Sequence, residues 1–102
     1  MAIVEVSVVP IGTKKTSLSR YVAGCMKVLG ESGLPYQLNS MGTVIEGDLA
    51  EVLDVVRRMH EAPFAAGVTR VTTLIKIDER RDGAGHSMAA KIRSVEEKLQ
   101  KV

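Results

Sequence analysis

The sequence has few of the residues on which many catalytic and binding sites depend. Its 102 residues include one cysteine, two tyrosines, one phenylalanine and no tryptophan. A single cysteine excludes a disulfide scaffold, and it excludes a zinc or iron–sulfur site built from the thiolates of one chain. Apolar runs are only a few residues long, so no transmembrane helix of about 20 apolar residues is predicted. The first residues lack the pattern of a secretory signal, and a cytoplasmic location is expected.

Charge of neither sign predominates along the chain. The sequence carries 14 basic and 12 acidic side chains, which gives a net charge of +2. This balance does not indicate a nucleic-acid partner, and no membrane partner is expected either. Hydrophobic residues make up 45% of the sequence, which is ordinary for a globular protein. We therefore predict a single domain over residues 1–102, with one core of its own.

The periodicity of apolar residues predicts strands in three segments. Residues 2–10 alternate between a fully apolar face and a mixed face, and residues 68–82 do the same. Residues 36–47 are typical of two short strands, with the turn between them at Met41 and Gly42. β-branched residues are frequent in these segments, as is usual in strands.

Helical spacing predicts three helices. The first begins near Thr16 or Ser17, either of which is a suitable capping residue, and ends at Gly33. The second begins at Asp48 and ends between Pro63 and Gly67. A third helix begins near Ser87 and carries a narrow apolar stripe like a coiled-coil seam, formed by Met88, Ile92, Val95 and Leu99.

The resulting order is β-α-β-β-α-β followed by one more helix. This order predicts an α+β fold, a ferredoxin-like sandwich in which two helices cover one face of a four-stranded antiparallel sheet. The uncovered face combines apolar residues such as Ile3, Val9 and Leu74 with polar ones. We expect a second subunit to cover it, with the last helix as a seam. Arg80 or Arg81 is a candidate to reach across the interface, and a surface charge network over residues 78–82 is the alternative. The expected partner is the chain itself, as a homodimer or homotetramer.

Several segments together resemble the small thiamine-binding protein family. They are VSVVPIGTKKTSLSRY (residues 6–21), YQLNSMGTVIEG (36–47) and IKIDERRD (75–82), followed by KIRSVEEKL (91–99). The resemblance covers essentially the whole chain in the same order. It implies a ferredoxin-like fold that assembles into dimers and commonly tetramers. It also implies non-catalytic binding of thiamine or its hydroxymethylpyrimidine moiety, which would be a ligand and not a catalytic cofactor.

An aminopyrimidine presents ring nitrogens and an exocyclic amine, which a carboxylate and hydroxyl groups can bind together. Flat or polarizable side chains would cover the face of the ring. We predict a ligand site on the open sheet face near a subunit interface. Its candidate residues are Glu5, Ser7, Tyr36, Asn39, Met41, Thr43 and Glu46. The alternative interpretation is that these polar groups are satisfied by an oligomer interface.

A second candidate is the glycine turn that leads into the first helix, where Lys14, Thr16 and Ser17 are candidates to bind an anion such as phosphate or sulfate. A solvated turn with an ordinary helix cap is the alternative. Cys25 lies on the apolar stripe of the first helix, which indicates an inert core thiol. His60 is expected to be packed and His86 to be exposed. No metal cluster is predicted, because these residues show no ligand spacing.

Other functions remain open at this point. An enzyme with Glu46 as acid or base would need a second catalytic group, and none has a recognisable spacing, so no catalytic residue is predicted. An RNA-binding domain with this strand order would stack bases on aromatic residues, where this sequence has valine, serine, threonine and isoleucine. A structural or regulatory homo-oligomer with an anion site and no role in thiamine binding is a further alternative.

Overall fold

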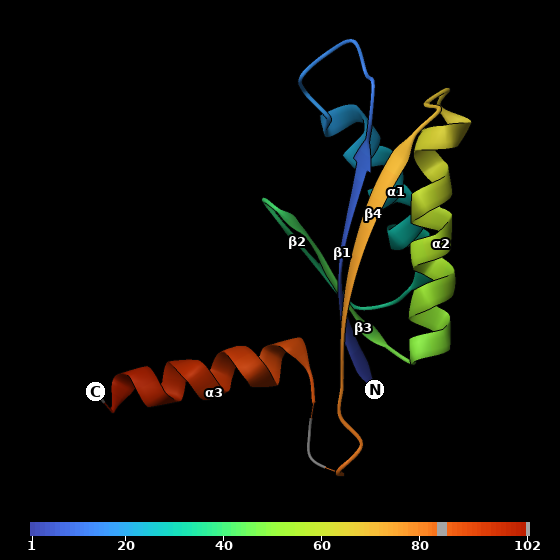
Figure 1. The fold of residues 1–102 in the computed structure, drawn as a ribbon. Helices are drawn as coiled ribbons and strands as arrows, with labels where there is room; N and C mark the ends of the chain where they lie inside the picture. The colour runs from blue at the N-terminus through green and yellow to red at the C-terminus, as the bar shows by residue number, and fades with distance from the viewer. Residues whose placement is uncertain (84–85, 102) are drawn as a thin grey trace.

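The strands and helices follow in the order that the sequence predicts. The structure is a computed structural model that describes residues 1–83 and 86–101. The elements are β1 (Ala2–Pro10), α1 (Ser19–Ser32), β2 (Tyr36–Asn39), β3 (Gly42–Gly47), α2 (Leu49–Ala65), β4 (Val71–Glu79) and α3 (Met88–Gln100). The four antiparallel strands form a sheet in the order β2-β3-β1-β4, with α1 and α2 on one face (Figure 1). This confirms the ferredoxin-like α+β fold with an added C-terminal helix.

The pairing register determines which side chains face the helices. In β1, Val4 lies between Ile45 of β3 and Ile77 of β4. Side chains of paired residues project from the same face of a sheet, and successive residues alternate between the faces. Ile3, Glu5, Ser7 and Val9 therefore lie on the open face, as the alternation in the sequence predicts.

The core lies between this sheet and the two covering helices. Fully buried side chains come from the sheet and from both helices, as shown by Val4, Leu29, Ile45 and Val52. The other buried apolar residues of this cluster are Ala2, Val6, Cys25, Val55, Val56 and Met59. The apolar stripes of α1 and α2 thus provide the burial that holds the helices on the sheet.

The helix ends agree with the sequence in part. Asp48 caps α2, because its Oδ2 accepts a hydrogen bond from the Glu51 N–H at 3.4 Å, and Gly33 ends α1 in a left-handed conformation with φ of 76°. The predicted start of α1 at Thr16 or Ser17 is wrong. The helix begins at Ser19 without a side-chain cap, because Leu18 occupies the N-cap position, and the Ser17 hydroxyl bonds to that of Ser19 at 3.2 Å. β4 is also shorter at both ends than the predicted strand over residues 68–82.

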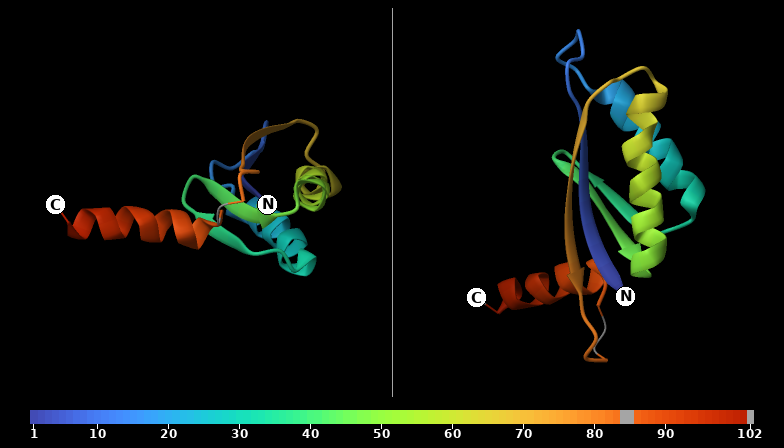
Figure 2. Two further views of the ribbon diagram at one scale, coloured as in Figure 1. Left: turned by 90° about the horizontal axis from the view of Figure 1, so that it is seen from below. Right: turned by 45° about the vertical axis from the view of Figure 1, so that its right-hand side comes forward.

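Helix α3 extends away from the rest of the molecule. None of its residues is buried, and both views of Figure 2 show it pointing away from the sheet and the other helices. The radius of gyration is 15.5 Å, whereas a compact domain of this length has about 13 Å. The apolar stripe predicted for this helix is present and uncovered, with Leu99 66% exposed.

Candidate functional site

A groove lies between the start of α1 and the β2–β3 hairpin. It has a volume of about 380 Å³, which is within the usual range for small-molecule sites. Four predicted ligand residues line it, namely Ser7, Asn39, Met41 and Thr43. The other lining residues are Val6, Val8, Val9, Leu18, Val22, Cys25, Met26, Leu38, Ser40, Gly42 and Met59. We call this space the hairpin groove.

The hairpin groove exists because the strands differ in length. β3 begins at Gly42, and its pairing with β1 starts opposite Val6, whereas β1 continues to Pro10. Beyond Val6, the described strands pair with β1 only on its β4 side. Since β1 is a central strand, residues 7–10 leave one backbone edge unpaired inside the sheet. The N–H and C=O groups of such an edge require hydrogen-bond partners.

The polar side chains of the groove differ in how they are satisfied. Thr43 is only 5% exposed, and its hydroxyl donates to Met26 Sδ at 3.7 Å. A thioether is a weak acceptor, so this hydroxyl retains capacity for a stronger partner. The Cys25 thiol donates to the carbonyl of Met59 at 3.4 Å, and burial raises the pKa of this thiol. Cys25 is therefore a protonated core thiol, as the sequence predicts.

The predicted ligand residues lie on both faces of the sheet and not on the open face alone. Glu46 lies on the open face opposite Ile3, while Thr43 lies on the helix face opposite Val6. Glu5 is exposed on the open face between Val44 and Lys76 in the pairing register. These carboxylates do not line the hairpin groove with the Thr43 hydroxyl. The prediction of one shared site on the open face is thus corrected.

Glu46 and Tyr36 lie outside the hairpin groove and have other neighbours. The Glu46 carboxylate accepts a hydrogen bond from the Met88 N–H at 2.8 Å, so it binds the N-terminus of α3. Tyr36 pairs with Ile45 on the helix face, is 44% exposed and does not line the hairpin groove. Local sequence patterns do not indicate the contact with Met88, because it joins residues 42 positions apart.

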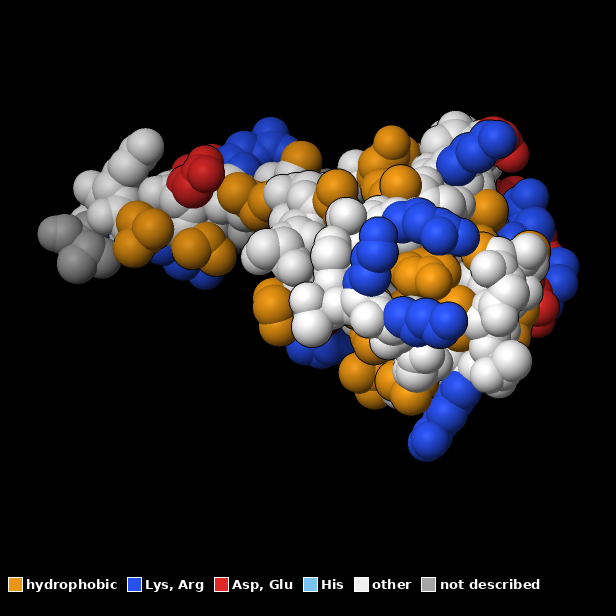
Figure 3. Space-filling view, turned by 90° about the horizontal axis from the view of Figure 1, so that it is seen from above, with side chains coloured by type: hydrophobic (Ala, Val, Ile, Leu, Met, Phe, Trp, Pro, Cys, Tyr) orange, Lys and Arg blue, Asp and Glu red, His pale blue; other side chains and the backbone are white. Residues whose placement is uncertain are grey.

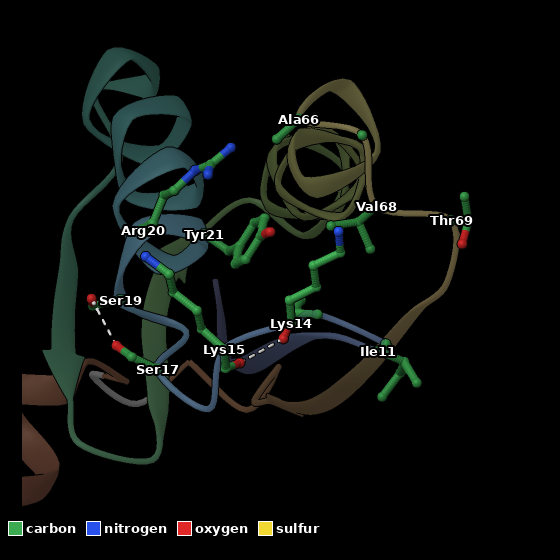
Figure 4. Close-up of a pocket in the computed structure, with 13 residues that line it drawn as sticks. Ile11, Lys14, Lys15, Ser17, Ser19, Arg20, Tyr21, Ala66, Val68 and Thr69 are labelled. Atoms are coloured by element: carbon green, nitrogen blue, oxygen red, sulfur yellow. Dashed lines mark hydrogen bonds between the residues drawn. The ribbon is translucent and has the colours of Figure 1, made fainter.

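A second, larger cavity lies between the β1–α1 loop and the α2–β4 connection. Its volume is about 610 Å³. Figure 4 shows Tyr21 between the side chain of Lys14 on one side and those of Lys15 and Arg20 on the other. The remaining lining residues are Ile11, Gly12, Thr13, Ser17, Ser19, Ala66, Gly67, Val68 and Thr69. We call this space the basic pocket.

The basic pocket contains part of the anion site that the sequence predicts. Lys14 and Ser17 line it, whereas Thr16 is exposed and does not. Sequence reasoning placed Lys15 near this turn but missed Arg20 and Tyr21 as lining residues. It placed the start of α1 too early, and the later start brings the first turn of the helix to the pocket wall.

A charged cluster joins the end of β4 to α3. Lys91 Nζ donates a hydrogen bond to Asp78 Oδ2, and this bond is the main reason why the pKa of Asp78 is lowered. His86 Nε2 lies 3.2 Å from the carbonyl oxygen of Asp78, and its side chain is only 7% exposed. The expectation that His86 is exposed is therefore wrong, because its imidazole lies against Asp78 of β4. Arg80 forms an ion pair with Asp82 at 2.8 Å within the same chain.

His60 and the possible metal-ligating side chains are the remaining candidates. His60 is packed as predicted, with Nδ1 at 2.6 Å from the Thr73 hydroxyl and its ring edge-on to Phe64. Within residues 1–83 and 86–101, no three His, Cys, Asp or Glu side chains are grouped so as to hold a metal ion. In the same part of the chain, every helix is too short or too polar to cross a membrane.

Known proteins are similar to this chain over nearly its whole length. The UPF0045 protein YqgV of Bacillus subtilis is 45% identical, and the match covers 98% of this chain and 99% of that protein. A UPF0045 protein of Methanothermobacter thermautotrophicus is 43% identical, with 97% of this chain and all of that protein covered. Each match therefore spans nearly the full length of both proteins.

Solved structures show the same fold. Protein MJ1052 of Methanocaldococcus jannaschii has a TM-score of 0.84 and 36% identity, covering 94% of this chain and 96% of that chain. A Thermotoga maritima protein, TM0486, provisionally named for thiamine biosynthesis or salvage, has a TM-score of 0.77. It is 19% identical, with 92% of this chain and 97% of that chain covered. The model of the family described as thiamine-binding protein matches residues 4–96. This chain therefore belongs to the thiamine-binding protein family.

Proposed function

We propose that the chain is a non-catalytic binding protein for thiamine or its hydroxymethylpyrimidine moiety, and that the hairpin groove is the site. The observation that carries this proposal is the unpaired edge of β1 over residues 7–10, which lies beside polar side chains in a mostly apolar groove. Membership of the family supports the ligand class.

The chemistry of the groove suits an aminopyrimidine. The edge of β1 offers the Val8 N–H as a donor to a ring nitrogen and C=O groups as acceptors for the exocyclic amine, whereas Pro10 has no N–H. The Asn39 amide both donates and accepts, and the Thr43 hydroxyl completes the polar set. Met26 and Met41 contribute polarizable sulfur atoms that contact flat rings favourably.

Binding without turnover fits the reactive groups that are present. Nucleophilic catalysis needs a nucleophile activated by a neighbouring base. Burial raises the pKa of the Cys25 thiol, so the nucleophilic thiolate is disfavoured. The His60 imidazole is engaged with Thr73. The proposed role is therefore retention or delivery of an unchanged ligand.

A second copy of the chain is the partner in this proposal. The accessible surface is 7021 Å², whereas a folded monomer of this mass exposes about 5,600 Å². The excess is larger than the roughly 800 Å² that each partner buries in a standard interface. The exposed apolar residues that would be covered are Leu74, Ile75, Ile77, Ile92, Val95 and Leu99. They lie on α3 and on β4, an edge strand of nine residues, and long edges favour pairing with another chain.

Calorimetric titration with thiamine, hydroxymethylpyrimidine and the separate thiazole moiety tests the ligand and its site. We expect the first two to bind with a fixed ratio to the chain and to be recovered unchanged. Thr43→Val keeps the shape of the side chain and removes its hydroxyl, and it should weaken binding about fivefold or more, as for one lost hydrogen bond.

Thr69→Val is the matched control, because Thr69 lies outside the hairpin groove. Its affinity for the ligands should equal that of the unchanged protein. An equal loss in both variants would contradict the proposed site. If neither thiamine nor hydroxymethylpyrimidine bound, the ligand proposal would fail and a structural oligomer would be the better description.

A further inference from the structure

The basic pocket gathers cations without carboxylates. Lys14, Lys15 and Arg20 line it, and no lining residue is Asp or Glu. In the described part of the chain these three side chains have no ion-pair partner. Basic residues elsewhere, such as Arg57 and Arg80, do lie beside carboxylates. Like charges gathered in one concave site produce a positive potential that attracts an anion.

The first turn of α1 adds to this potential. The helix begins at Ser19, no side chain caps it, and its first turn contains no acidic residue. The first backbone N–H groups of a helix have no partner within the helix, and they carry its positive dipole end. Ser17 and Ser19 bring hydroxyl groups to the same wall of the pocket.

The pocket also has an apolar part that a free inorganic ion would not use. Figure 3 shows basic side chains around an apolar centre at this end of the molecule. Figure 4 places Tyr21 between Lys14 and the other two cations, with Val68 beside Lys14, and the guanidinium of Arg20 lies 5.4 Å from the centre of the Tyr21 ring. An aromatic surface beside positive charge suits a ligand that joins a phosphate to a flat ring.

We propose that the basic pocket binds a small organic phosphate, with the phosphate group held by Lys14, Lys15 and Arg20 and its flat ring placed on Tyr21. The cavity volume of about 610 Å³ accommodates a molecule of this kind. This site is separate from the hairpin groove and does not depend on thiamine binding there.

Titration of the ¹⁵N-labelled protein, followed by amide chemical shifts at fixed ionic strength, tests the proposal. The probes are inorganic phosphate, diphosphate, adenosine monophosphate and adenosine. We expect the monophosphate to shift signals of residues 12–21 and 66–69 saturably, and to bind at least about tenfold more tightly than inorganic phosphate or adenosine. Saturation by inorganic phosphate with equal affinity would contradict an organic ligand.

Charge variants distinguish a specific phosphate site from general attraction between an anion and a basic surface. Lys14→Gln and Arg20→Gln should each weaken monophosphate binding about tenfold. Lys27→Gln removes the same charge from an exposed position of α1 outside the pocket and should have no effect. An equal loss in all three variants, or stronger binding of single-stranded RNA across a wider surface, would overturn the proposal. Thiamine binding measured without a phosphate ligand should be unchanged in these variants, so the two proposals can fail independently.

Discussion

At the scale of single residues, Glu46 links the sheet to the C-terminal helix. Its carboxylate accepts the Met88 N–H at 2.8 Å, while the Ser87 hydroxyl accepts the Ala90 N–H at 3.0 Å. Both contacts satisfy N–H groups that a helix leaves without partners, and negative charge is favoured at this end of a helix. A side chain of β3 therefore helps to hold the start of α3 against the sheet.

Replacing Glu46 tests this attachment. Glu46→Leu removes the acceptor, and we expect the amides of residues 88–91 to exchange with solvent about tenfold faster, as for one lost charge-assisted hydrogen bond. Amides of α2 should be unaffected. Glu46→Gln retains an acceptor oxygen, so the exchange rates of these amides should be close to those of the unchanged protein. Equal exchange rates in α3 of all three proteins would mean that Glu46 does not hold the helix.

The thiol of Cys25 offers a second test at the residue scale. Because burial raises its pKa, we expect it to react with a thiol reagent at least about tenfold more slowly in the folded chain than in denaturant. The folded chain holds this proton more tightly than the unfolded chain. The free energy of unfolding should therefore fall as pH rises above the pKa of the unfolded thiol, and Cys25→Ala should remove that fall. A rapid reaction in native buffer would contradict the burial.

At the scale of secondary structure, sequence patterns predicted some features of the strands correctly and others wrongly. Two-residue alternation correctly predicted the faces of β1, because burial on one face imposes that period. The same rule could have separated Thr43 from Glu46, since residues an odd number of positions apart in a strand point to opposite faces. The candidate ligand residues share suitable chemistry, but their side chains lie on opposite faces of the strands.

Other features could not be predicted from local pattern. The hairpin groove depends on β3 starting opposite Val6 while β1 continues to Pro10, which is a matter of long-range register. The start of α1 was placed early because Thr16 and Ser17 are good caps in isolation. The loop instead uses Ser17 to bond with Ser19, so a favourable capping residue did not determine the helix boundary.

The link between β4 and α3 should respond to acid. The pKa of Asp78 is lowered, first by the hydrogen bond from Lys91 and then by the charges of Lys91, His86 and Lys76, while desolvation opposes the change. Because the pKa of Asp78 is lower in the folded chain, its carboxylate stabilises the fold at pH values above about 3.9, the pKa of an aspartate in an unfolded chain. This stabilisation is lost as the pH falls through the pKa of Asp78 in the folded chain.

Carboxyl NMR titration measures this effect directly. We expect Asp78 to titrate below an ordinary aspartate, and Lys91→Met to return its pKa toward the ordinary value. Acidification should also bring the shifts of the first turn of α3 closer to those of an Asp78→Asn variant. An ordinary pKa for Asp78 in the unchanged protein would show that the Lys91 contact is absent in solution.

At the scale of the whole molecule, the exposed stripe of α3 predicts assembly. Leu99 is 66% exposed, and Ile92 and Val95 lie on the same side of the helix. Leu99→Asp would place a charge in the proposed contact, so we expect the sedimenting species to become smaller. Ser94→Asp adds the same charge on another side of α3 and should leave the mass unchanged. A monomeric unchanged protein, or equal masses for both variants, would contradict the proposed seam.

The two pockets share one short piece of chain. Leu18 and Val22 line the hairpin groove, while Ser19, Arg20 and Tyr21, which lie between them, line the basic pocket. The start of α1 is therefore a common wall, and a ligand that moves it on one side changes the room available on the other. Any such coupling must be reciprocal: the factor by which an organic phosphate changes the affinity for the pyrimidine equals the factor by which the pyrimidine changes the affinity for the phosphate.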